Sequence, residues 1–141
     1  MDRRQRTDAD WRRVVVVAGV LLGANLLPAK RRDPPQPPPY GVDKALHGVG
    51  HGTLVVALVE AYDAGEWSVG PSIVAIVLST GYGLALELLQ RWIPGRRYER
   101  GDVFASLVGS VLAVALFRWR VSASESVGSS GDPVNRRVDE E

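Results

Sequence analysis

The sequence predicts an all-α fold, a four-helix transmembrane bundle, and three observations support this prediction. Along 141 residues, about the length of one domain, four apolar blocks alternate with charged segments. Three of these blocks lack the charged outer stripe that a soluble amphipathic helix shows at a period of 3.6 residues, so we expect them to face lipid. The tryptophans lie at block ends, where an indole ring favours the headgroup level of a bilayer. They are Trp11, Trp67, Trp92 and Trp119.

The first block follows a basic segment, residues 1–13, and predicts a span at about residues 14–29. Its run VVVVAGVLLGANLL has one polar side chain, Asn25, and is 14 residues long. That is short, because the hydrocarbon core of about 30 Å needs roughly 20 helical residues, so Trp11 and Ala29 must extend the span. A signal peptide would look similar, but no clean small-residue cleavage site follows. We therefore interpret the block as a membrane span.

A proline-rich connector, residues 28–41, follows the first block with the sequence PAKRRDPPQPPPYG. Proline lacks an amide donor and fixes φ, so we expect an extended, polyproline-like segment here. The remaining apolar blocks predict the other three spans, which complete a membrane domain over residues 14–120. These spans are placed at about residues 45–62, 72–92 and 103–119.

The last segment, residues 121–141, is rich in Ser, Gly, Asp and Glu and offers little apolar surface, so it is expected to be a disordered polar tail. Within the blocks, small residues recur four apart, a spacing that permits close helix contact in membranes. Examples are Gly48 with Gly52, Ser79 with Gly83, and Ala105 with Gly109 and Ala113.

Composition excludes several classes of function. The formal net charge of +1 gives no global field for nucleic acid, so we expect no nucleic-acid partner. The absence of cysteine excludes disulfides, Cys-ligated zinc and thiol catalysis. Four spans would place both termini on one side, but Lys and Arg are divided almost evenly, with nine on that side and eight on the other. The usual dominance of the first helix leads us to expect cytoplasmic termini in a cell-membrane protein.

Charged side chains near the spans are the candidate functional residues, because each costs roughly 2.5 to 3.5 kcal/mol on insertion scales. Asp43, His47 and His51 are four apart, and so share one face of the second span. The start of that span, the end of the third and the start of the fourth lie on one membrane side, so we expect their polar groups to converge. Asp102, just before an apolar run, also suits an N-cap. The predicted cluster consists of Asp43, Lys44, His47, Glu87, Gln90, Arg96 and Asp102.

The order of these motifs resembles the VanZ-like family over residues 43 to about 117. The pattern is Asp-Lys-x-x-His at residues 43–47, Glu-x-x-Gln at residues 87–90, Pro-Gly-Arg at residues 94–96, and then Asp102 with Gly109. Ser106 stands where that family commonly has Asn, which keeps a hydrogen-bonding group but loses an amide. The resemblance implies a multi-pass membrane protein. The trait of the family's namesake is reduced susceptibility to a glycopeptide antibiotic, and the family name is no proof of resistance here.

Three functions remain open from the sequence. In the first, the chain is non-catalytic, and its interfacial cluster binds or shields an amphipathic ligand or lipid headgroup, with Lys44, Arg96 and Arg97 available to pair with phosphate or carboxylate. In the second, the chain is a membrane-embedded hydrolase or transferase for a lipid-linked substrate, with His47 as acid or base oriented by Glu87 or Asp102. In the third, the cluster is a structural network that fixes helix packing.

No cofactor and no metal are expected. His47 and His51 form H-x-x-x-H, but the Glu that follows the first His in a zincin motif is missing. The expected partners are membrane lipids and an amphipathic or lipid-linked ligand. The identity of that ligand, the oligomeric state and the roles of His51 and Ser106 do not follow from the sequence.

Overall fold

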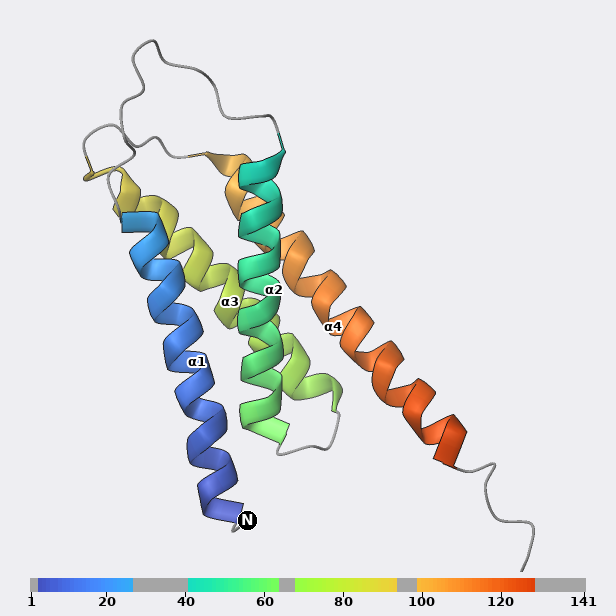
Figure 1. Ribbon diagram of the computed structural model, residues 1–141. Coiled ribbons are helices and arrows are strands. Elements are labelled where there is room, and N and C mark those ends of the chain that lie inside the picture. The colour runs from blue at the N-terminus through green and yellow to red at the C-terminus, as the bar shows by residue number, and fades with distance from the viewer. Residues whose placement is uncertain (1–2, 27–40, 64–67, 94–98, 129–141) are drawn as a thin grey trace, which may run out of the picture.

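The computed structural model describes residues 3–26, 41–63, 68–93 and 99–128, and this part of the chain is helical with no strand (Figure 1). The all-α prediction is therefore confirmed over these residues. The four helices are α1 (Arg3–Leu26), α2 (Val42–Asp63), α3 (Val69–Gln90) and α4 (Arg100–Gly128).

The helices run alternately up and down, so α1 and α3 finish at the end of the molecule where α2 and α4 begin (Figure 1). We call this the cluster end, and the other the opposite end. Helix α2 is central and packs against all three other helices, whereas α1 and α4 share no contact within the described ranges. Helix α4 diverges from α1 toward the opposite end, which leaves one side of the bundle open (Figure 1).

The apolar core lies where α2 meets α1 and α3. Its buried members are Leu54, Val55, Leu58 and Val59 of α2 and Ala75 of α3. These positions fall on a continuous face of α2 because residues three and four apart share a side of a helix. The core is small for a chain of this length, since many large apolar side chains point outward instead.

Glycines set the contact between α2 and α4. A methyl group added at Gly52 would lie 3.0 Å from the Gly109 carbonyl oxygen and 3.1 Å from the Ala113 Cβ atom. One added at Gly109 would overlap the backbone of Gly48. Two of the small-residue rows seen in the sequence thus face each other, and their backbones approach closely, as membrane helices commonly do. We call this contact the glycine seam.

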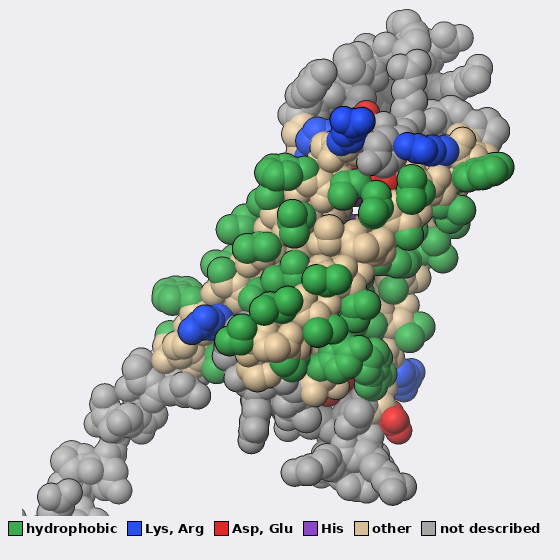
Figure 2. All heavy atoms as spheres, turned by 180° about the vertical axis from the view of Figure 1, so that it is seen from behind, with side chains coloured by type: hydrophobic (Ala, Val, Ile, Leu, Met, Phe, Trp, Pro, Cys, Tyr) green, Lys and Arg blue, Asp and Glu red, His purple; other side chains and the backbone are tan. Residues whose placement is uncertain are grey.

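The outer surface is strongly apolar between its two ends. Figure 2 shows hydrophobic side chains across the middle of one face and the charged side chains toward its ends. Val16, Val77 and Leu112 are each more than half exposed although they lie in the middle of their helices. A water-soluble monomer rarely leaves apolar surface on this scale uncovered, so the surface favours a lipid environment.

Two helices are long and apolar enough to cross a membrane, namely α3 and the part of α4 from Arg100 to Ala123. Neither is a core helix, because only 33% of the apolar window in α3 and 17% of that in α4 is buried inside the protein. These two helices support two of the four expected spans. No other described helix meets the same criterion of length and apolar composition. Helix α1 begins with charged turns, and α2 includes Asp43, Lys44 and two histidines, which lower their apolar character.

Several boundaries differ from those expected. Helix α1 begins at Arg3, so most of the basic segment 1–13 is the first part of that helix. Helix α4 continues to Gly128, so residues 121–128 are helical and not disordered as expected. No proline or glycine occurs between Arg120 and Gly128, so nothing interrupts the helix before that glycine. The rest of the tail, most of connector 28–41, and Trp67 lie outside the described residues.

Candidate functional site: a polar cluster at one end of the bundle

Lys44 links the start of α2 to the start of α4. Its Nζ donates hydrogen bonds to Asp102 Oδ1 at 3.0 Å and to Glu99 Oε2 at 3.1 Å. The hydrogen bond to Asp102, and to a smaller extent the one to Glu99, raise the pKa of the Lys44 ammonium above its usual value of 10.5. The group therefore stays charged at neutral pH and neutralises Asp102, which is only 5% exposed.

Asp102 is not the N-cap that the sequence indicated. Helix α4 begins at Arg100, so Asp102 lies inside its first turn, and its backbone N–H donates to the Glu99 carbonyl at 3.1 Å. The side chain points into the cluster instead of capping the helix. A carboxylate in a first turn still interacts favourably with the positive end of the helix dipole.

Glu87 and His47 face each other across the cluster. Glu87 is 2% exposed, and its Oε2 accepts a hydrogen bond from the Glu99 backbone N–H at 3.1 Å. Its other oxygen, Oε1, lies 3.7 Å from His47 Nε2, and both atoms are buried without a hydrogen-bond partner. This distance is too long for a direct hydrogen bond. A buried site with two unpartnered atoms thus lies between α2 and α3.

The other ring nitrogen of His47 indicates what these atoms require. Nδ1 lies 3.1 Å from the Asp43 carbonyl oxygen, which can only accept, so Nδ1 carries the proton in this contact. In a neutral His47 the facing Nε2 is then an acceptor, as is the Glu87 carboxylate. Two acceptors that face each other are best satisfied by a group that donates hydrogen bonds to both, such as an ammonium or a pair of neighbouring hydroxyls.

His51 extends this polar row one helical turn deeper. It is fully buried, and its Nδ1 lies 3.1 Å from Ser79 Oγ, while that hydroxyl donates to the His51 carbonyl at 3.1 Å. Because the Ser79 proton is used in this way, His51 Nδ1 must be the donor to Ser79 Oγ. His51 Nε2 has no partner, and it faces Gly83, where an added methyl group would lie 3.1 Å from it. Ser106 Oγ donates to the Asp102 carbonyl at 2.8 Å.

Gln90 ties the end of α3 to the end of α1. Its Nε2 donates to Asn25 Oδ1 at 2.7 Å, and Asn25 Nδ2 donates to the Leu21 carbonyl at 2.8 Å. Asn25 was not among the predicted cluster residues. Its signal in the sequence was its place as the only polar side chain in the first apolar run, because a buried amide in such a run needs a partner.

The structure therefore brings together Lys44, His47, Glu87 and Asp102, with Gln90 beside them on α3. Asp43 is exposed at the edge, with Oδ1 4.0 Å from His47 Nδ1. Arg96 and Arg97 lie outside the described residues. Asp43, His47 and Asp102 can each offer one ligand atom within 4.8 Å of the others. Asp102 Oδ1 already accepts a hydrogen bond from the Lys44 ammonium, which would compete with a metal ion for that oxygen.

A comparison of the chain with protein-family models, with curated proteins and with solved structures finds no match.

Proposed function

We propose that this chain is a multi-pass cell-membrane protein of the VanZ-like type with four spans and cytoplasmic termini. In this proposal the protein is non-catalytic, and its polar cluster binds the headgroup of an amphipathic ligand. The observation that carries the proposal is the buried, unpartnered pair formed by His47 Nε2 and Glu87 Oε1. Leaving a buried polar atom without a partner costs about 1–3 kcal/mol, and a bound donor group would remove that cost.

Exposed aromatic side chains support the four-span placement. Trp92 is 85% exposed at the cluster end, while Trp119 is 70% exposed near the opposite end. Trp11 and Tyr62 pack edge to face at the opposite end, with ring centroids 5.4 Å apart. From Lys44 to Tyr62 the central helix rises about 27 Å, close to the bilayer core of about 30 Å. The cluster would then lie at the headgroup level of one leaflet.

Charge favours a particular class of headgroup. Among the described residues of the cluster, the single Lys44 is outnumbered by acidic side chains, and both of its close partners are carboxylates. An anion placed beside Glu87 and Asp102 would therefore lie next to carboxylates, while the cations Arg91 and Arg100 lie further out at the ends of α3 and α4. A headgroup with hydroxyl groups, or with a primary ammonium, would instead donate hydrogen bonds to Glu87 and His47.

A structural network is the second candidate, and one observation favours it. Hydrogen bonds at the cluster end join all four helices, through Lys44 with Asp102, Glu99 with Glu87, and Gln90 with Asn25. Such a network can fix one helix arrangement without binding a ligand. The hydrolase or transferase alternative would need a nucleophile near His47. The nearby hydroxyls of Ser79 and Ser106 already donate to backbone carbonyls.

The test measures which lipids remain bound to the purified protein in nanodiscs. The discs contain phosphatidylcholine, which has no headgroup donor, and an equal amount of a glycosyl diacylglycerol, which is also uncharged but rich in hydroxyls. We expect the native chain to enrich the glycosyl lipid, and Glu87→Gln to lose that enrichment because its amide puts a donor in place of one of the two facing acceptors. Glu60→Gln makes the same chemical change at the opposite end and should bind as the native chain does.

Thermal unfolding of the same samples separates the two candidates. A ligand site predicts that Glu87→Gln unfolds at nearly the native temperature. A structural network predicts a clearly lower unfolding temperature for Glu87→Gln and no lipid preference in the native chain, and that result would overturn the ligand proposal.

A further inference from the structure

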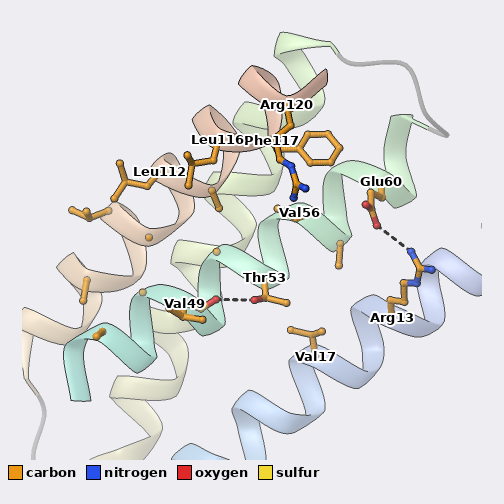
Figure 3. Close-up of a pocket in the computed structure, with 18 of the residues that line it drawn as sticks. Arg13, Val17, Val49, Thr53, Val56, Glu60, Leu112, Leu116, Phe117 and Arg120 are labelled. Carbon is orange, nitrogen blue, oxygen red and sulfur yellow. Dashed lines mark hydrogen bonds and ion pairs between the residues drawn. The ribbon is translucent and has the colours of Figure 1, made fainter. Parts of the chain in front are cut away.

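An apolar groove of about 930 Å³ runs along the open side of the bundle, far larger than a packing defect (Figure 3). It exists because α1 and α4 do not meet, so that α2 forms its floor. Val17 of α1, Val56 of α2, and Leu116 of α4 are among the apolar side chains that line it. Thr53 contributes a hydroxyl, but that group donates to the Val49 carbonyl at 2.8 Å and so is already satisfied.

The groove has cations at its two ends, and they differ in whether they are paired. Lys44, at the cluster end, is held by two carboxylates. Arg13, at the opposite end, lies 3.3 Å from Glu60. Arg120 lines the groove at that same end and makes no hydrogen bond or ion pair with any described residue. Figure 3 shows its side chain extending from α4 over the groove toward α2.

We propose that this groove binds an acyl chain of an anionic phospholipid, whose phosphate pairs with Arg120. The inference uses the membrane placement proposed above, but it is independent of the ligand of the polar cluster and concerns the opposite end of the bundle. Arg120 follows the exposed Trp119, and the Trp11 and Tyr62 rings lie at the same end, so its guanidinium is at the headgroup level. The groove continues from there into the hydrocarbon level.

The shape and charge of the groove fit this occupant. Between Lys44 and Glu60 the floor helix rises about 24 Å, most of a bilayer core of about 30 Å, so a chain entering from one leaflet is covered along its length. The occupant must be apolar over that length and anionic at the Arg120 end. A guanidinium offers a planar fork of donors that matches two phosphate oxygens, which distinguishes Arg120 from a simple point charge.

The experiment places the purified protein in nanodiscs of phosphatidylcholine and phosphatidylmethanol in equal amounts, and native mass spectrometry identifies the lipids that stay bound. Phosphatidylmethanol is anionic but has no headgroup donor, so the polar cluster gives it no advantage. We expect the native chain to enrich it and Arg120→Gln to lower that enrichment about fivefold, equivalent to about 1 kcal/mol for one Arg near the surface. Arg118→Gln is the matched control, because Arg118 is exposed on the same helix and does not line the groove. Equal losses in both variants would mean general surface attraction and would overturn the proposal.

A second variant tests where the chain lies. Val56→Trp fills the groove while leaving Arg120 intact, so the retained lipid should be lost, whereas Val77→Trp on the outer face of α3 should retain it. If Val56→Trp does not fold, Val49→Trp at the exposed edge of the groove replaces it. Unchanged lipid retention in the folded variant would show that no acyl chain occupies the groove. The same conclusion would follow if the native chain formed a dimer that the variant does not form, because a second copy of the chain would then fill the groove.

Glu87→Gln should keep its preference for phosphatidylmethanol. A failure of the cluster proposal can therefore be distinguished from a failure of the groove proposal.

Discussion

Replacing Gly109 with Ala is the most direct test of how α4 is held on α2. The new methyl group would fall on the backbone of Gly48, which cannot rotate away as a side chain can. The two helices must therefore separate, and overpacking of this kind costs about 1–3 kcal/mol. Alanine also favours the helix over glycine by about 1 kcal/mol, which offsets part of that cost. We expect Gly109→Ala to be less stable than the native chain by up to about 2 kcal/mol.

Gly81→Ala provides the matched control. Gly81 lies on the exposed side of α3, and an added methyl group would have no neighbour within 4 Å. The same substitution should then stabilise the protein, by at most about 1 kcal/mol, through helix propensity alone. The free energy of unfolding is measured for both variants by denaturant titration in the same detergent. If Gly109→Ala proves as stable as Gly81→Ala, the glycine seam does not hold α2 and α4 together.

Three further predictions concern polar contacts. Ser79→Ala leaves the buried Nδ1 of His51 without its acceptor and should lower the free energy of unfolding by about 1–3 kcal/mol, whereas unchanged stability would count against this hydrogen bond. Gln90→Leu removes the donor to Asn25, so hydrogen exchange should become faster in the last turn of α1, and native exchange rates there would contradict the link. Because the pKa of Lys44 is raised on folding, its contribution is complete below the usual value of 10.5 and is lost as pH rises through the higher folded pKa. The stability difference between the native chain and Lys44→Met should thus be constant from about pH 7 to about pH 9 and shrink only at more alkaline pH, and a decline within that interval would contradict the raised pKa.

The helices and the convergence of the cluster could be predicted because both follow from short-range rules. Apolar blocks separated by proline, glycine and charge define four helices, and alternating direction brings the ends of α2, α3 and α4 together. Lys44, Glu87 and Asp102 needed no further information to be placed near one another. The pairing of individual atoms could not be predicted, because it depends on the rotation of each helix about its axis. Asp102 therefore proved to be a partner of Lys44 and not an N-cap.

The groove could not be predicted, since it results from an absence of contact between α1 and α4. The apolar pattern of each helix shows that a side is hydrophobic but not whether another helix or lipid covers it. Arg120 therefore looked like an ordinary basic flank at the end of a span. Asn25 could have been found, because a lone amide inside an apolar run needs a hydrogen-bond partner, but its pairing with Gln90 depends on how α1 leans on α3.

The glycine seam also determines how far α4 can slide along α2. Gly48 and Gly52 are one turn apart on the face of α2 that continues to Lys44, and Gly109 lies on the face of α4 that leads back to Asp102. A slide of α4 by one turn would bring Ala105 or Ala113 opposite Gly48, where the close backbone contact leaves no room for a methyl group. The axial register of the two helices is therefore set by apolar contact, and the ion pair forms because that register leaves its two members opposite each other.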